Sequence, residues 1–163
     1  MQTLELLAPA KTAAIGIEAI RHGADAVYIG ADSFGARSAA GNSIADIAQL
    51  CQYAHTFGAR VYVTINTLVY EHEIAALKQL LCALDAIEVD ALLLQDMGVY
   101  ALIKRWTTTE KWHFQLHAST QTDNRSANKV AWLQALGFQR AVLARDLSVE
   151  EIAAIHAQVP RME

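Results

Sequence analysis

The strongest constraint on the fold is a regular alternation between short strand-like runs and amphipathic helical segments along the whole chain. Six apolar runs of five to seven residues lie at 4–8, 26–30, 60–66, 90–95, 112–117 and 140–144. Segments with helical spacing of apolar residues lie at 15–20, 44–57, 74–87, 99–106, 126–136 and 148–157. Because connections between successive parallel strands need a crossover, usually a helix, this pattern predicts parallel strands joined by right-handed βαβ units.

Helix boundaries in the sequence support the same alternation. Ser43 with Asp46, and Ser148 with Glu151, have the spacing of a capping box at a helix start. A glycine follows three of the helical segments, just before the next strand: Gly23, Gly58 and Gly137. Glycine is the favoured residue just after a helix, so each unit is predicted to end as a helix–glycine–strand connection.

Two architectures fit alternating strands and helices, an open doubly wound sheet and a closed barrel of eight units. No GxGxxG motif follows the first strand, which disfavours a dinucleotide-binding sheet. Six units of about 27 residues extrapolate to the roughly 250 residues of a (β/α)₈ barrel. The chain closes with VPRME, a polar turn that leads toward another strand. We therefore predict one α/β domain over residues 1–163, an incomplete TIM-type (β/α) barrel with about six of eight units and the C-terminal units absent.

The composition favours a protein of a reducing cytoplasm. Hydrophobic residues make up 53% of the chain and charged residues 18%, as expected for strands buried on both faces. The most apolar window is interrupted well short of the roughly 18 residues that a membrane span needs, and the N-terminus lacks the features of a signal peptide. Cys51 and Cys82 lie beside core positions of helical segments and are expected to be buried thiols without a disulfide.

In a barrel of this type, function collects at the carboxyl ends of the strands. Every predicted strand is followed there by polar residues, and a long glycine-containing loop at 30–43 follows the second strand. The predicted substrate-binding residues are Arg37, Asn66, Gln95, Asp96, His117, Ser119, Gln121 and Arg145. No catalytic residue is assigned, and no histidine or cysteine spacing indicates a metal site.

Several of these positions have a purely structural alternative. Asn66, Asp96 and Asp146 could each cap the helix that follows. Glu5 alternates with leucines and is expected to face the barrel interior, where a carboxylate is costly without a partner. An ion pair with Arg37 or Arg145 would make Glu5 a structural residue, whereas contact with a ligand would make it a functional one.

Hydrolytic and Schiff-base chemistry find little support in the sequence. His117 and Ser119 could form a nucleophile–base pair oriented by Asp96 or Asp146, but no GxSxG motif is present. Lys11 is the single lysine at a strand end, which leaves an aldolase-type mechanism one poorly placed candidate. The net charge of −4 shows no basic footprint for nucleic acid in this segment.

Seven segments in order, ELLAPA, HGADAVYIG, FGAR, VTINTL, LLLQDMG, LHASTQ and VLARDLS, give the chain a specific resemblance. It resembles the U32 "peptidase" family over essentially all of its length. Within that family, FGAR–GNS, QDMG and LHASTQTDNR are similar to the branch of 23S ribosomal RNA 5-hydroxycytidine synthases.

The resemblance implies a bacterial, cytoplasmic RNA-modifying protein with a TIM-like barrel, and prephenate as co-substrate. Arg37 and Arg145 would suit the two carboxylates of prephenate, and Gln121 or Asn66 a base edge. An iron–sulfur cluster is implied only for cysteines beyond this segment, so no cofactor is expected here and Cys51 and Cys82 are not its ligands. Hydroxylation of transfer RNA uridine and a collagenase-like peptidase activity are the alternatives. The segment alone is expected to be inactive, to bind RNA only as part of the full-length protein, and to self-associate through open strand edges.

Overall fold

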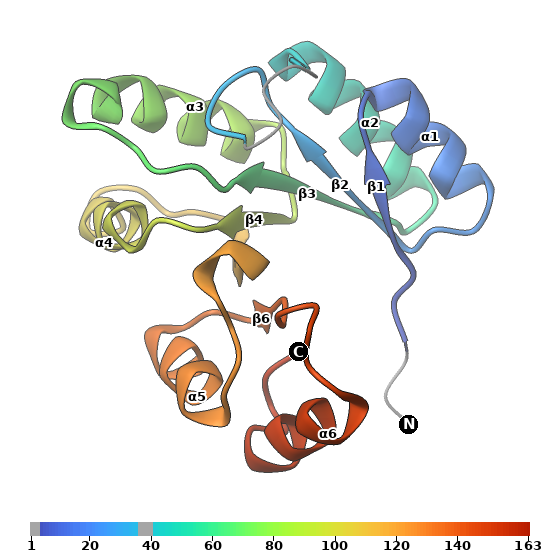
Figure 1. The fold of residues 1–163 in the computed structure, drawn as a ribbon. Coiled ribbons are helices and arrows are strands. Elements are labelled where there is room, and N and C mark those ends of the chain that lie inside the picture. Colours follow the sequence, from blue (N-terminus) through green and yellow to red (C-terminus); the bar gives the residue numbers. More distant parts are fainter. Residues whose placement is uncertain (1–3, 36–40) are drawn as a thin grey trace.

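A computed structural model describes residues 4–35 and 41–163 as a curved parallel sheet covered by helices (Figure 1). The strands are β1 (Leu7–Ala10), β2 (Ala26–Gly30), β3 (Arg60–Ile65), β4 (Ala91–Leu94), β5 (Gln115–Ala118) and β6 (Arg140–Ala141). The helices are α1 (Ala13–Arg21), α2 (Ile44–Thr56), α3 (Ile74–Ala86), α4 (Met97–Trp106), α5 (Ala127–Leu136) and α6 (Val149–Gln158), with single 3₁₀ turns η2 (Glu71–Glu73) and η3 (Thr120–Thr122).

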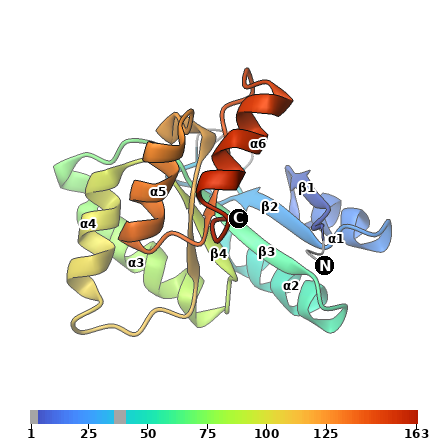
Figure 2. The same ribbon diagram turned by 90° about the horizontal axis from the view of Figure 1, so that it is seen from below.

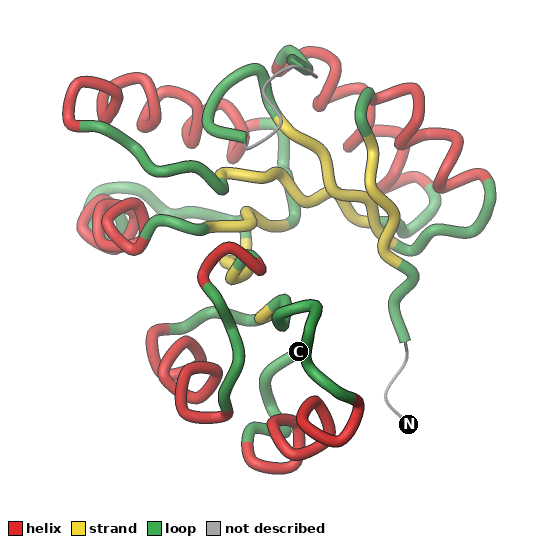
Figure 3. Tube along the Cα trace, viewed as in Figure 1, coloured by secondary structure: helices red, strands yellow, loops and turns green. Residues whose placement is uncertain are grey.

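The order of the strands in the sheet identifies the architecture. All strands pair in parallel with their neighbours in sequence, in the order β1-β2-β3-β4-β5-β6. A doubly wound sheet reverses its strand order at a switch point, and this sheet does not. The strands follow an arc with the helices on its outer side, and the segment before β1 and the C-terminal residues lie on the open side (Figures 1 and 3). The view from below shows the helices around the strands (Figure 2). The predicted incomplete (β/α) barrel is confirmed.

The sheet is buried on both faces. Its outer face presents residues such as Val27, Val61 and Leu92, which are 0% exposed and belong to the large core under the helices. On that side α3 contributes Leu77 and Leu81, also fully buried. Burial stabilises the fold by about 1.5–3 kcal/mol for each such side chain. A second, smaller apolar cluster on the inner face contains Ala26, Tyr62, Ala91 and Leu93, with Leu7 and Tyr28 packed against it.

The predicted helix boundaries are accurate because local side-chain chemistry determines them. Ser43 and Asp46 form the capping box of α2, and Ser148 and Glu151 form that of α6. Gly137 follows the last residue of α5, and its φ of 93° is a conformation that glycine adopts without strain.

Three strands differ from the prediction by more than one residue at an end. β1 and β5 begin later than expected, at Leu7 and Gln115, and β6 pairs only over Arg140–Ala141. The expectation that both cysteines are buried is wrong for one of them, since Cys51 is buried but Cys82 is exposed on α3.

Candidate functional site

The carboxyl ends of β3, β4 and β5 bring three predicted residues into one row. The register pairs Thr64 with Leu93 and Leu93 with His117. The positions two residues further along share the same inner face, because side chains alternate across a strand. These positions are Asn66, Gln95 and Ser119. The main-chain N–H of Ser119 donates to the carbonyl of Leu94 at 2.8 Å, so the β4–β5 ladder extends to this row.

Asp96 is a structural residue. It is the N-cap of α4, and its Oδ1 accepts a hydrogen bond from the Gly98 N–H at 2.7 Å. Its Oδ2 accepts from the Val69 N–H at 3.1 Å, which fixes the loop after β3. A Cβ at position 98 would lie 3.0 Å from Asp96 Oδ1, so the glycine of the QDMG motif makes room for this cap. The capping alternative is therefore confirmed for Asp96.

The other two capping candidates do not cap helices. Asp146 pairs with Arg125, and the N-cap of α6 is Ser148 instead. Asn66 precedes a loop, and the N-cap of α3 is Glu73. Both residues follow the carboxyl ends of their strands, and neither is without an interaction partner.

The polar segment after β5 is mainly a local scaffold. Ser119 is 3% exposed, and its Oγ accepts from the Gln121 N–H at 3.3 Å. Asn124 is 0% exposed, and its Nδ2 donates to the carbonyls of Ser119 at 3.0 Å and Val142 at 2.9 Å. Asn124, which the sequence argument did not select, therefore ties the end of β5 to the end of β6.

The remaining candidates differ in accessibility. Gln121 and Arg145 are exposed at the carboxyl edge, and neither side chain has a hydrogen bond or ion pair with another described residue. Gln95 is half-buried in the row with Asn66. Arg37 lies outside the residues that the structure describes.

The structure does not assemble a nucleophile–base pair from His117 and Ser119. His117 is 1% exposed, and its Nε2 lies 3.4 Å from Gln115 Oε1 rather than at Ser119. Burial, together with the nearby Arg140 charge, lowers the pKa of His117 to about 3. The carboxylates of Asp96 and Asp146 are bonded elsewhere. The imidazole is therefore a neutral, buried group of the inner face.

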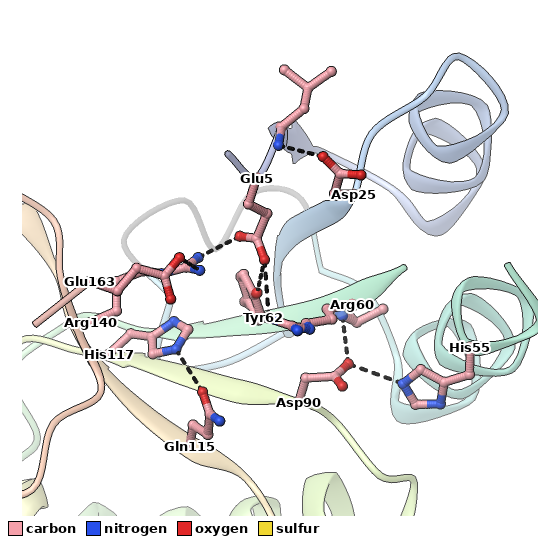
Figure 4. Close-up of polar contacts among 12 residues, drawn as sticks. Glu5, Asp25, His55, Arg60, Tyr62, Asp90, Gln115, His117, Arg140 and Glu163 are labelled. Atoms are coloured by element: carbon pink, nitrogen blue, oxygen red, sulfur yellow. Dashed lines mark hydrogen bonds and ion pairs between the residues drawn. The ribbon is translucent and has the colours of Figure 1, made fainter. Parts of the chain in front are cut away.

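A second polar cluster lies at the opposite, amino end of the strands (Figure 4). Glu5 precedes β1 and accepts from Arg140 Nη1 at 2.6 Å and from the Tyr62 hydroxyl at 2.7 Å. Arg60 reaches the same carboxylate at 3.3 Å. The Arg140 guanidinium lies 5.1 Å from the centre of the Tyr62 ring, and the His117 ring meets that ring edge-on at 4.8 Å.

The electrostatics of this cluster favour ionised partners. Burial alone would raise the pKa of Glu5, but hydrogen bonds from Arg140 and Tyr62 and the charges of Arg140 and Arg60 outweigh it and hold that pKa below its usual value. Burial and the hydrogen bond to Glu5 raise the pKa of Tyr62 to about 12. At neutral pH the phenol therefore donates a hydrogen bond to an ionised carboxylate.

Of the two predicted partners of Glu5, Arg145 was wrong, and Arg37 lies outside the described residues. Glu5 does face the interior, but Arg140 and Arg60 pair with it, whereas Arg145 lies exposed at the other end of the sheet. A sequence signal was available, because Arg60 and Arg140 are each the charged first residue of an apolar strand.

Two hollows among the described residues lie away from the carboxyl edge. One of about 490 Å³ is lined by residues before and at the start of β3, β4 and β5, including Arg60, Asp90 and Gln115. The other, of about 150 Å³, lies between α4 and the starts of β5 and β6, beside Lys104 and Trp112.

Metal-binding groups are scarce in the described ranges. No group of three or more His, Cys, Asp or Glu residues there could hold a metal ion. Burial raises the pKa of the Cys51 thiol to about 12, and Cys82 is on another helix, so these two cysteines do not fit an iron–sulfur cluster, which needs about four ligands. Across residues 4–35 and 41–163, we find no helix with the length and apolarity to cross a membrane.

Residues 12–163 match the sequence model of peptidase family U32. The chain belongs to this family. It is 48% identical over 153 residues to the 23S rRNA 5-hydroxycytidine C2501 synthase of Escherichia coli K12, covering 94% of this chain and 22% of that protein. It is 33% identical to tRNA hydroxylation protein P1 of Bacillus subtilis 168, covering 95% of this chain and 36% of that protein.

The fold agrees with that of a solved family member. The U32 peptidase Mk0906 superposes with a TM-score of 0.70 at 14% identity, over 97% of this chain and 67% of that structure. This chain spans between about a fifth and two thirds of the length of these three proteins.

Proposed function

We propose that this chain is the amino-terminal barrel part of an RNA-hydroxylating protein that acts on C5 of a cytidine in 23S ribosomal RNA, with prephenate as co-substrate. The observation that carries the proposal is the 48% identity to the E. coli synthase, which extends over 94% of this chain. An RNA substrate would make the cytoplasm its site of action.

The carboxyl edge offers suitable binding groups. Gln121 and Arg145 are exposed, and Gln95 and Asn66 add amides in the inner row beside them. An amide carries paired donor and acceptor atoms for a base edge, and a guanidinium suits a carboxylate. We assign Gln121 and Asn66 to the base and Arg145, with Arg37, to prephenate.

This chain's part in the reaction is binding and orientation. Replacing a C5 hydrogen by a hydroxyl removes two electrons from the base, and prephenate, as the donor of the hydroxyl oxygen, would be reduced by the same two electrons. An iron–sulfur cluster in a cysteine-containing segment outside residues 1–163 would supply electron transfer. The base must leave its stack or be modified in nascent RNA, since its edge is inaccessible within a helix.

Hydroxylation of transfer RNA uridine is the second candidate, favoured by the 33% identity to the B. subtilis protein. A peptidase activity is less well supported. Ser119 is buried and its hydroxyl accepts from a main-chain N–H, while the neutral His117 bonds to Gln115. A peptidase needs an activated nucleophile or a metal-bound water.

The deciding experiment is nucleoside mass spectrometry of ribosomal RNA from cells that lack the gene encoding this chain. Loss of 5-hydroxycytidine, restored by the wild-type gene but not by Gln121→Ala or Arg145→Ala, would support the proposal. Gln79→Ala and Arg105→Ala, at exposed positions of α3 and α4, are matched controls that should restore it. An unchanged ribosomal profile with loss of a hydroxylated uridine in transfer RNA would favour the second candidate. Unchanged RNA and proteolysis blocked by serine- or cysteine-directed reagents would favour the peptidase.

We also propose that residues 1–163 alone are inactive and self-associate. β1 pairs with one strand of the sheet, β2, and Leu4 and Leu6 beside β1 are 97% and 59% exposed. Open edges and exposed apolar side chains favour pairing between copies. Sedimentation of residues 1–163 at micromolar concentration should show a dimer or a larger species. A monomer alone would contradict this part of the proposal.

A further inference from the structure

The last residue of the chain is hydrogen-bonded to the main chain on both sides of Arg140 in β6. The main-chain N–H of Glu163 donates to the carbonyl of Gln139 at 3.3 Å, and the main-chain oxygen of Glu163 accepts from the Ala141 N–H at 2.8 Å. These two bonds flank Arg140, which is the hydrogen-bond pattern of a parallel strand pair centred on Arg140 and Glu163. They occupy the edge of β6 that faces away from β5.

The neighbouring side chains follow the alternation of a strand. Met162 is 6% exposed and belongs to the large core on the outer face of the sheet. The Glu163 side chain points the other way and pairs with Arg140 on the inner face (Figure 4). A shift by one residue would exchange these two environments, so the register is specified by side-chain chemistry.

Arg140 binds two carboxylates with one guanidinium. Nη1 donates to Glu5 and Nη2 donates to Glu163, while the Arg140 side chain is only 10% exposed. Glu5 is fixed by Tyr62 and Arg60, so it sets the direction of the guanidinium. Because the guanidinium is planar and its Nη1 is fixed by Glu5, its Nη2 points in a defined direction.

Charge explains why that second side requires a carboxylate. Arg60 and Arg140 bring two positive charges to Glu5, which contributes one negative charge. A mostly buried guanidinium whose charge is not balanced by a carboxylate is costly. Glu163 supplies the second negative charge. β6 is only two residues long, so backbone pairing alone would define its outer edge weakly.

We propose that the outer edge of β6 is a docking edge for a parallel strand that carries a carboxylate opposite Arg140, and that Met162–Glu163 is the start of that strand. Arg140 is thus a positioning residue: it recognises the acidic side chain and thereby sets the register. The inference is independent of the proposed RNA chemistry.

Hydrogen exchange of two adjacent amides tests this proposal. The Ala141 N–H donates to Glu163, whereas the Val142 N–H donates to Ala118 in β5. In Glu163→Gln, exchange at Ala141 should accelerate by at least about fivefold relative to exchange at Val142, as expected when a charged hydrogen bond is weakened. Glu18→Gln, which removes an exposed carboxylate paired with Arg21, is the matched control and should change neither amide.

Two further variants separate a strand from a chain-end contact. Arg140→Lys keeps the charge but cannot hold two carboxylates in one plane, so it should accelerate exchange of the Ala141 amide. In the Arg140→Lys background, adding Glu163→Gln should then change Ala141 exchange very little. A chain extended by glycine and serine after Glu163 removes any terminal carboxylate from this position. Protection of Ala141 should persist in the extended chain. Loss of protection on extension, or equal Ala141 exchange in Glu163→Gln and Glu18→Gln, would overturn the proposal.

Discussion

Replacing Glu5 by glutamine should destabilise the fold far more than replacing a surface glutamate. Glu5 and Arg140 are 15% and 10% exposed, and the carboxylate also receives the Tyr62 hydroxyl at 2.7 Å. Removing one partner of a buried ion pair costs roughly 3–5 kcal/mol. Glutamine retains one acceptor oxygen and Arg140 retains Glu163, so we expect a smaller loss in the free energy of unfolding, about 2–3 kcal/mol. For a chain of this size that corresponds to roughly 4–12 °C in Tm.

Urea denaturation at pH 7, followed by circular dichroism, measures this loss. The midpoint should fall at unchanged m, since the same surface is exposed on unfolding. Glu18→Gln removes an exposed ion pair with Arg21 at 2.6 Å and should change stability by less than about 1 kcal/mol. Equal midpoints for Glu5→Gln and Glu18→Gln would refute the argument that the amino-end cluster stabilises the barrel.

The difference in stability between wild type and Glu5→Gln should depend on pH. The pKa of Glu5 is lowered in the folded state, so its stabilisation is fully present above the unfolded pKa of about 4.3 and is lost as pH falls through the folded value. The stability gap between wild type and Glu5→Gln should therefore be constant from pH 7 to about 5 and shrink below about 4. A gap that grows on acidification would contradict the assignment of Glu5 as an ionised partner.

Two other residues give independent predictions. The pKa of His117 is lowered to about 3 in the folded chain. Between about pH 6.5 and pH 3 the unfolded chain therefore binds a proton that the folded chain does not. The free energy of unfolding should decrease as the pH is lowered through this range, by up to about 1.4 kcal/mol per pH unit. His117→Gln should flatten that slope in urea titrations over this range, and an unchanged slope would mean that the imidazole is not buried as a neutral group. Asn124→Ala removes two donors from buried carbonyls and should lower the free energy of unfolding by about 2–3 kcal/mol. Asn124→Asp, which also lacks the Nδ2 donors, should lose at least as much in the same denaturation assay, and a stable aspartate variant would show that these hydrogen bonds do not tie β5 to β6.

The helices and the strand order could be predicted because local rules determine them. Apolar spacing defines the buried face of α3, and the capping boxes at Ser43 and Ser148 mark helix starts. Strand ends were less predictable, because tertiary hydrogen bonds decide them. The apolar run after Arg140 stops pairing with β5 early, since the Val142 carbonyl and the Ala144 N–H both bond to Asn124. The His113 N–H bonds to Asp85 rather than to a neighbouring strand, so β5 starts later than its sequence suggests.

The candidate site was predicted in part. The sequence placed Asn66, Gln95 and Ser119 at the carboxyl ends of their strands, and the strand register of the structure aligns them in one row. The amino-end cluster was missed because Glu5 and Arg140 are 135 residues apart, so a charged first residue in a strand could not be matched to Glu5 from spacing alone. Sequence position also suggested Arg145 as the partner of Glu5, whereas strand direction puts these two residues at opposite ends of the sheet.

The distribution of hydrogen bonds at the carboxyl edge narrows where a ligand would bind. Asp96 uses both carboxylate oxygens on main-chain N–H groups, and Asn124 uses its amide on two carbonyls, so each is committed to the scaffold. Gln121 and Arg145 are exposed and have no side-chain partner among the described residues. They follow β5 and β6, whereas Asp96 follows β4. A ligand that replaces water at available donors and acceptors would therefore gain most on the β5–β6 side of the carboxyl edge.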